Sequence, residues 1–418
     1  MSVEQPVRNL GWQVTFAGLG INLALGILYT WSVISGKIPD SWHWGEADRS
    51  WPYAIACLVF SLVMIPAGRL QDRFGPRVVA SVGGLLVGLG MILASLTTSF
   101  VIFAVAFGVL AGAGIGCGYA AATPPAVKWF SAKRTGMIAG IVVSGFGLAS
   151  VYAAPLTSFL IESFGVSRTM LILGIAFTVV VVGLAQLLVP PPAGYVPAGA
   201  NPAKGTPAAG AKREVSALGM LGTVPFYLLW FLYFCGAGAG LMFISKIKII
   251  GHIQADITNA FILVAACAVG NGAGRIVAGT LSDKLGRQAT LFGAFVFQAV
   301  LMLLLSVATG DSSLTALPVM LLISALIGAN YGANLSLFPS ITKDYYGLKN
   351  FGINYGILFT AWGIGGFLLP LMAGTIFDAA KRLDPGQVGN FTYAYYVAAV
   401  LLVIAAALTF TVKAPKSA

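Results

Sequence analysis

The chain has 418 residues, of which 58% are hydrophobic and only 9% are charged. Soluble domains carry about 25% charged residues, so this composition excludes a water-soluble globular protein. The formal net charge of +11 would suit a nucleic-acid partner, but the positions of the charges, described below, argue against one.

Apolar runs of roughly 20 residues, long enough to cross a bilayer of about 30 Å, recur along the chain. The first run is too long for a signal peptide's apolar region and has no small-residue cleavage site after it, so we expect it to be a span. The sequence predicts an all-α membrane protein, embedded in the lipid bilayer, with twelve spans near residues 10–35, 51–69, 77–97, 100–124, 136–160, 168–190, 222–246, 257–280, 289–309, 314–338, 350–374 and 391–412.

The basic residues are unevenly divided between the two sides of the membrane. If the N-terminus is cytoplasmic, sixteen Lys and Arg residues fall in inside segments and seven in outside ones. The seven are Lys37, Arg49, Arg168, Lys246, Lys248, Lys381 and Arg382. This bias is the positive-inside rule. It predicts a multi-pass protein of the cell (plasma or inner) membrane with both termini in the cytoplasm, and it explains the net charge without nucleic acid.

An internal repeat divides the chain into two halves. A Gly, an acid, a base and a second Gly recur at the same spacing 211 residues apart. The two copies are Gly68-Arg-Leu-Gln-Asp72-Arg73-Phe-Gly75-Pro-Arg77 and Gly279-Thr-Leu-Ser-Asp283-Lys284-Leu-Gly286-Arg287. We expect each copy to act as a conformational latch, with its Gly allowing close helix approach. The predicted domains are a six-helix half at 1–190, a Pro- and Gly-rich cytoplasmic linker at 191–216, and a second half at 217–418.

Arg275 is the one formal charge expected in the membrane interior, because every Asp and Glu falls in a loop or within about a turn of a span end. Such an arginine costs about 2.5 to 3.5 kcal/mol and therefore faces a partner, a cavity or a substrate. Its planar fork suits a substrate carboxylate; solvation by backbone or by water is the alternative. Paired acids, nucleophile–base pairs and metal-ligand clusters are not evident among the spans. We therefore expect neither an enzyme nor a metal or other cofactor.

Several motifs together resemble the major facilitator superfamily, and within it the branch of oxalate/formate antiporters and monocarboxylate transporters. Beside the two repeated loops they are Tyr29-Thr-Trp31, Gly112-Ala-Gly-Ile-Gly-Cys-Gly-Tyr119, Trp129-Phe-Ser-Ala-Lys133-Arg134, Asn271-Gly-Ala-Gly-Arg275, Leu337-Phe-Pro339 and Asn354-Tyr355-Gly356. The resemblance implies a twelve-helix carrier that works by alternating access and that functions as a monomer.

The same resemblance implies a substrate site. Dianion exchangers of this branch have an arginine in span 8 and a lysine in span 11, and Trp362 occupies the lysine position here. One cation instead of two implies a small monocarboxylate such as lactate or pyruvate. The positions that line the branch's cavity, together with two positions that are more polar elsewhere and one further polar candidate, are Tyr29, Tyr119, Phe146, Tyr331 and Phe359, then Leu28 and Leu335, and then Asn334. Taken singly, each of them could equally be ordinary packing.

Coupling depends on Asn271, because proton-coupled members of the branch resemble one another in having an aspartate at that spacing from the arginine. An Asn cannot carry a proton. However, bringing a monoanion into a cell held at about 100 mV negative costs about 2.3 kcal/mol, which a co-transported proton cancels. We therefore expect proton symport, with the proton near the carboxylate, Arg275 and a tyrosine. Obligatory exchange of two carboxylates, of the oxalate–formate type, is the alternative.

Overall fold

The computed structural model describes residues 9–130, 135–192, 195, 214–310, 312–347, 350–383 and 390–415. In that part of the chain all regular structure is helical. The longer elements are α1 (Gly11–Leu25), α2 (Trp31–Ser35), α3 (Glu46–Phe74), α4 (Pro76–Ser95), α6 (Gly112–Val127), α7 (Thr135–Ala185), α9 (Val224–Ala255), α10 (Phe261–Leu285), α11 (Arg287–Val307), α12 (Leu317–Tyr346), α13 (Phe351–Leu383) and α14 (Thr392–Thr409). The short ones are η1 (Gly26–Thr30), η2 (Asp40–Trp42), α5 (Phe100–Phe103), the π-helical η3 (Ala104–Ala111), α8 (Ala217–Leu221) and η5 (Ser313–Thr315).

Eleven helical stretches of the described residues are long and apolar enough to cross a membrane. One of them, α7, has 51 residues, which at about 1.5 Å per residue is more than twice the thickness of the hydrocarbon layer. It is broken at Gly165, where φ is 76° and ψ is 170°. Since α7 therefore supplies two spans, the chain has the twelve spans that the sequence predicts.

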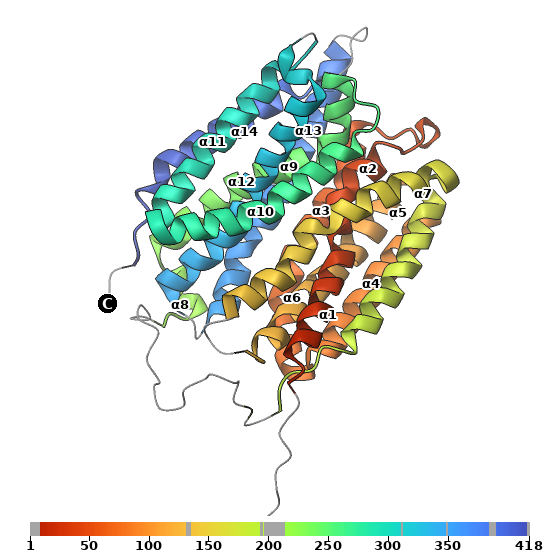
Figure 1. The fold of residues 1–418 in the computed structure, drawn as a ribbon. Helices are drawn as coiled ribbons and strands as arrows, with labels where there is room; N and C mark the ends of the chain where they lie inside the picture. The colour runs from red at the N-terminus through yellow and green to blue at the C-terminus, as the bar shows by residue number, and fades with distance from the viewer. Residues whose placement is uncertain are drawn as a thin grey trace, which may run out of the picture.

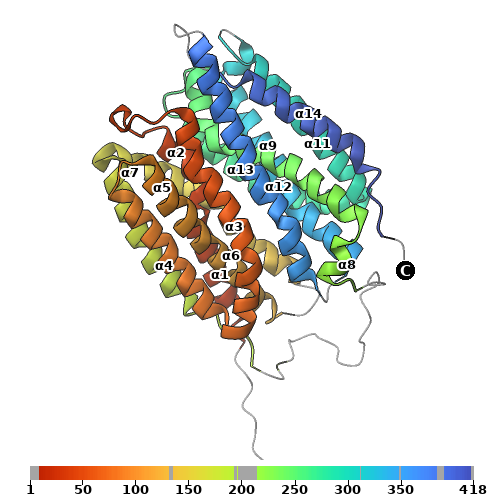
Figure 2. The ribbon, with the colours of Figure 1, turned by 180° about the vertical axis from the view of Figure 1, so that it is seen from behind.

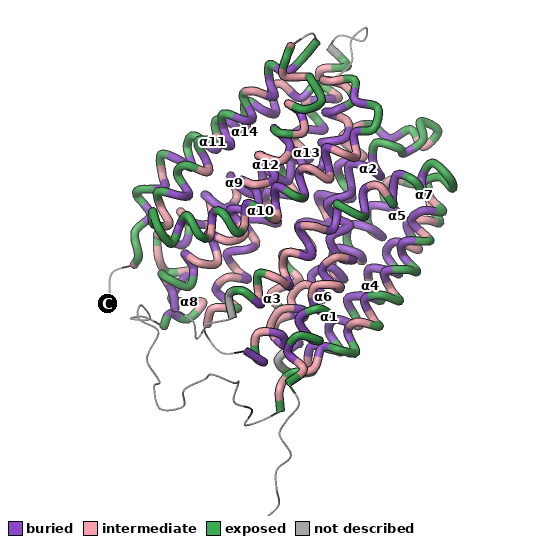
Figure 3. The backbone as a smooth tube through the Cα atoms, in the orientation of Figure 1, coloured by how far each residue is buried: buried purple, intermediate pink, exposed green. Residues whose placement is uncertain are grey.

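The helices form two bundles that lie side by side (Figures 1 and 2). One contains α1 to α7 and the other α9 to α14, and they meet where α3 packs on α13 and α7 packs on α10. We call the end at which α1 begins and α14 ends the terminal end, and the opposite end the distal end. Buried residues line the inner faces of the helices, whereas the outward faces are exposed (Figure 3). Many outward side chains are large and apolar, among them Leu89, Phe159 and Val400, as contact with lipid requires.

Four glycines at turns between spans share one backbone conformation. Gly75, Gly165, Gly286 and Gly347 have φ between 76° and 89°, and their ψ values lie within about 30° of 180°, a region that is essentially open only to glycine. Gly75 and Gly286 occupy the same position in the two sequence repeats. Their N–H groups donate to the carbonyls of Gln71 and Ser282, at 2.9 and 3.0 Å. The sequence repeat is therefore also a repeat of backbone geometry.

The contact between α3 and α13 is tight toward the distal end and opens toward the terminal end. A Cβ added at Gly363 would lie 1.8 Å from Ser61 Oγ, and one at Gly374 would lie 2.5 Å from Ser50 Oγ. On the same face of α13, a Cβ at Gly352 would meet nothing within 4 Å.

The contact between α7 and α10 follows the same pattern. Added Cβ atoms at Gly147 and Gly272 would lie 3.0 to 3.2 Å from side chains of the other helix, whereas at Gly140 and Gly279, two turns toward the terminal end, nothing lies within 4 Å. The two bundles are thus closed against each other at the distal end.

The predicted position of Lys246 and Lys248 in an outside loop is wrong. Helix α9 continues to Ala255, and the two lysines are only 3% and 9% exposed, so Arg275 is not the only charge inside the protein. Lys246 is tolerated because Glu46 of the other bundle pairs with it, with 3.1 Å between Nζ and Oε2. Likewise, α12 and α13 extend to Tyr346 and Leu383, well beyond their predicted ends.

Most of the predicted linker, including residues 196–213, lies outside the described residues. The domain boundaries at 190 and 217 therefore stay a prediction.

Candidate functional site

Arg275 lies two residues past the middle of the 25-residue helix α10. Its Nε donates to Asn271 Oδ1 at 3.2 Å, and its Nη1 donates to the carbonyl of Val143 on α7 at 3.1 Å. A guanidinium has five N–H donors, so three remain unused. Among the described residues no carboxylate forms an ion pair with it. A Cβ at Gly147 would lie 3.2 Å from Nη2, so the glycine makes room for the arginine.

A cavity of about 190 Å³ lies beside the guanidinium, between the two bundles. Its lining residues are Tyr29, Phe60, Tyr119, Phe146, Arg275, Leu335, Phe359 and Trp362. Pockets for drug-sized ligands measure about 300 to 1,000 Å³, so this cavity fits only a small molecule. Arg275 is the one formally charged residue in the lining, and most of the others are aromatic.

Hydrogen bonds connect the two bundles at one wall of this cavity. The hydroxyls of Tyr29 and Tyr331 lie 2.5 Å apart, and Trp362 Nε1 donates to the Tyr331 hydroxyl at 2.7 Å. Tyr29 reaches this position because the first span is interrupted by η1, a 3₁₀ segment. The interruption packs closely on α7, since a Cβ at Gly26 would lie 2.3 Å from that of Ala149.

Phe60, on α3, is the residue of this cavity that sequence reasoning missed. Its ring is 1% exposed. The ring centroids of Tyr119, Phe146, Phe359 and Trp362 all lie 5.1 to 5.7 Å from its own. A phenylalanine in an apolar span is the expected composition of any span, so the sequence carried no signal that would have distinguished it.

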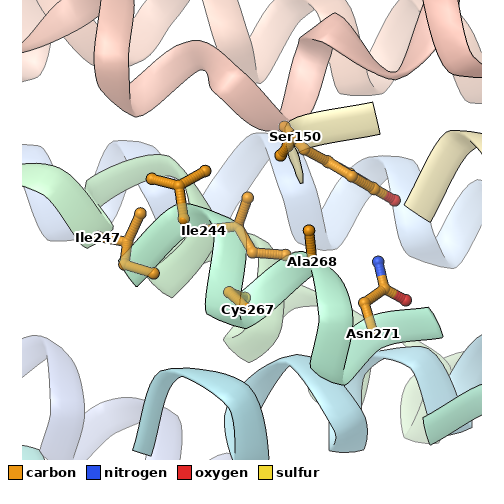
Figure 4. A pocket seen from close by; sticks show the side chains of 8 residues that line it. Ser150, Ile244, Ile247, Cys267, Ala268 and Asn271 are labelled. Atoms are coloured by element: carbon orange, nitrogen blue, oxygen red, sulfur yellow. The ribbon is translucent and has the colours of Figure 1, made fainter. Parts of the chain in front are cut away.

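A second cavity, of about 240 Å³, adjoins the first on the distal side of Asn271 (Figure 4). It is lined by Tyr29, Ser150, Ile244, Ile247, Val264, Cys267, Ala268 and Asn271. Ser150 faces the side chains of α9 and α10 across it. Asn271 both lines this cavity and accepts the hydrogen bond from Arg275, so the two spaces meet at the arginine.

The structure brings together most of the predicted site residues. Tyr29, Tyr119, Phe146, Arg275, Phe359 and Trp362 line the first cavity, and Tyr331 bonds two of them. Leu28 is fully buried and lines neither described cavity. Asn334 donates to the carbonyl of Asn330 at 2.9 Å and approaches Gly236 of α9, so it too lies away from the cavities. The functional roles of all these residues stay predictions.

The two predicted latches lie at the terminal end. Arg287 donates to Asp283 at 2.6 Å and to Asp344 at 3.1 Å, all within the second bundle. Arg73, Arg77 and Lys284 are exposed, and the side chain of Asp72 lies outside the described residues. Added Cβ atoms at Gly68 and Gly279 would meet nothing within 4 Å. In this conformation the glycines therefore hold no helix contact, and the described latch residues do not join the bundles.

Twelve spans in two bundles, with a small cationic cavity between them, define a multi-pass membrane transporter rather than an enzyme. A family model described as Major Facilitator Superfamily matches residues 16–310 and 239–418. The chain belongs to this superfamily, and it is therefore a secondary transporter.

Relatives in several organisms cover most of the chain. An uncharacterized MFS-type transporter of Escherichia coli, YhjX, is 27% identical and covers 85% of each chain. The oxalate:formate antiporter of Oxalobacter formigenes is 26% identical over 84% of this chain and 81% of its own. Mouse monocarboxylate transporter 11 is 24% identical over 94% and 85%.

The fold is also that of a solved structure. The crystal structure of a bacterial homolog of the human lysosomal transporter Spinster, in an inward-facing and unoccupied conformation, has a TM-score of 0.71 and 18% identity. The match covers 97% of this chain and 98% of that one.

Proposed function

We propose that this protein carries small monocarboxylates, such as lactate or pyruvate, across the membrane together with a proton. The observation that carries the proposal is the single cation in a small aromatic cavity, with three N–H donors unused. Two of these donors suffice to grip a carboxylate bidentately. The rings of Tyr119, Phe146 and Phe359 would then cover the apolar part of the substrate.

Trp362 supports a monoanion in preference to a dianion. Its ring stacks on Phe359, with centroids 4.9 Å apart, and it fills the wall where the resembling dianion exchangers place a lysine. A second carboxylate bound there would be buried without a cationic partner, at a cost of several kcal/mol. Relatives named as monocarboxylate transporters, at about 25% identity, support the same substrate class.

The transport cycle follows from the two ends of the molecule. We assign the terminal end to the cytoplasm on the strength of the positive-inside bias, which makes the present conformation inward-facing. In the outward-facing form the repeated loops, with Asp72 and Asp283, would come together and close the terminal end. The halves 1–190 and 217–418 would rock about a site near the midplane. One chain contains the whole pathway, so a monomer suffices.

Proton coupling is supported by charge balance. A monoanion entering against about 100 mV is opposed by about 2.3 kcal/mol, close to fiftyfold in accumulation, and a proton removes this penalty. Asn271 cannot hold that proton. We assign it to the neighbourhood of the bound carboxylate, Arg275 and the Tyr29–Tyr331 pair.

Exchange of two carboxylates is the second candidate, because the oxalate:formate antiporter is among the relatives. The two are separated by purified protein in empty liposomes, with labelled L-lactate, acid outside and the membrane potential clamped at zero. Accumulation that a protonophore abolishes is expected for symport. Uptake only into vesicles preloaded with a carboxylate would establish exchange, and no uptake under either condition would refute the monocarboxylate proposal.

A further inference from the structure

Two lysines on α9, two residues apart, have opposite surroundings. Lys246 is fully bonded: its Nζ lies 3.1 Å from Glu46 Oε2, 3.2 Å from the Glu46 carbonyl and 2.7 Å from Ser50 Oγ. Lys248 points about 200° away around the helix. Its side chain passes Gly36 at the end of α2, and its Nζ is buried without any hydrogen-bond partner among the described residues.

The charged groups around Lys248 do not satisfy its ammonium. Lys37 and Glu162, both in the first bundle, are the ones whose fields reach it. Glu162 is engaged elsewhere, with Lys37 at 3.7 Å and with the hydroxyl of Ser158 at 3.3 Å, and its side chain is 60% exposed. Lys37 carries the same charge as Lys248. A buried ammonium without a partner is costly, so an anion is the group that this position lacks.

The second cavity connects Lys248 to Arg275. Ile244 and Ile247 of α9 line it at the distal side (Figure 4), and Lys248 follows Ile247 directly. At the other side stands Asn271, the hydrogen-bond partner of Arg275. From the distal end inward the order is therefore a free cation, an apolar space and a second cation.

We propose that Lys248 is a second binding station for the substrate carboxylate, nearer the distal end of the translocation path than Arg275. In the form that is open at the distal end, an incoming anion pairs with Lys248 and then crosses the apolar cavity to Arg275. The cavity holds no charge that would retain the anion between the two stations. This inference rests on the proposed function, since it assumes that a carboxylate uses the path.

The test compares Lys248→Met with Lys246→Met, which removes the same charge from the same helix. We expect K248M to keep or raise the thermal stability of the purified protein, because it removes an unpaired buried charge, and to raise the apparent KM for L-lactate in proteoliposomes about tenfold or more. We expect K246M to lower the thermal stability, because it leaves Glu46 without its partner. Lys248→Arg should stay within about threefold of the wild-type KM, because it keeps the charge.

Two further variants separate a binding station from a general field effect or a hidden ion pair. Lys37→Gln removes an exposed charge of the same sign, and Glu162→Gln removes the nearest acid; both should leave KM within about twofold in 0.15 M salt. A K248M protein with unchanged KM, or with stability lost as in K246M, would overturn the proposal. So would a Glu162→Gln protein that reproduces the KM of K248M, since the lysine would then serve that acid.

If the wild type carries no monocarboxylate, the proposed function fails, and Lys248 is judged by binding alone. Acetate, lactate, oxalate and phosphate are each titrated against the thermal stability of wild type and K248M. An anion that stabilises the wild type more than K248M supports the station. Equal responses of the two proteins to all four anions would refute it.

Discussion

Replacing Arg275 by Gln tests the centre of the proposed mechanism. The guanidinium spends two of its five donors on Asn271 and Val143, so two of the remaining three can hold a carboxylate. Hydrogen bonds to charged groups contribute about 1.5 to 3 kcal/mol each, or about 3 to 6 kcal/mol for a bidentate pair. Since 1.4 kcal/mol is a factor of ten, R275Q should lower kcat/KM for lactate by about 10² to 10⁴.

The folded protein should survive this change. R275Q removes the bond to the Val143 carbonyl, a loss of about 1 kcal/mol, but it also removes a charge from the interior. The assay is labelled-lactate uptake into liposomes, with thermal stability and size-exclusion behaviour as the folding controls. Arg275→Lys is the matched variant: it keeps the charge and loses the planar fork, so its transport should fall between the two. A folded R275Q protein with transport within tenfold of wild type would show that the arginine serves only the contact with α7.

Three other changes address the cavity wall, the repeated turns and the distal closure. Trp362→Lys should raise oxalate transport relative to lactate, because it supplies a second cation; an unchanged ratio in competition assays would remove the argument for a monoanion. Gly286→Ala should destabilise the protein by about 1 to 3 kcal/mol, whereas Gly279→Ala, which has open space around it, should stay within about 0.5 kcal/mol; equal melting temperatures would contradict this. Glu46→Gln leaves Lys246 without its carboxylate. It should shift the population toward the form closed at the terminal end, as read by fluorescence transfer between labels on α3 and α10 at that end, and an unchanged distribution would mean that the Lys246–Glu46 pair does not hold the distal end shut.

Hydropathy and the repeated motifs were enough to predict the fold, because a span in lipid must bury its backbone hydrogen bonds in a helix of about 20 residues. The ends of α9 were not predictable in the same way. A lysine normally marks the edge of a span, and the sequence cannot show that Glu46, 200 positions earlier, supplies a partner for Lys246 in the other bundle.

The cavity was predicted largely through family resemblance, and the limits of that route are visible in particular residues. Tyr119 and Phe359 resemble cavity positions and do line the cavity. Asn334 is polar and lies three residues from Tyr331, yet it faces α9, since the helix turns it away from Arg275. Phe60 has no distinguishing neighbours in the sequence, and only the packing of four other rings around it reveals its place.

The bond between Tyr29 and Tyr331 has a consequence for the carrier when nothing is bound. The two hydroxyls come from opposite bundles and satisfy each other, with the Trp362 indole as a third member. An empty cavity therefore leaves neither hydroxyl without a partner, and the unloaded protein avoids the penalty of orphaned polar groups. A strict exchanger depends on an empty form that cannot turn over. Here the vacant state stabilises itself, which favours a carrier able to make its return stroke without cargo and so to move its substrate in one net direction.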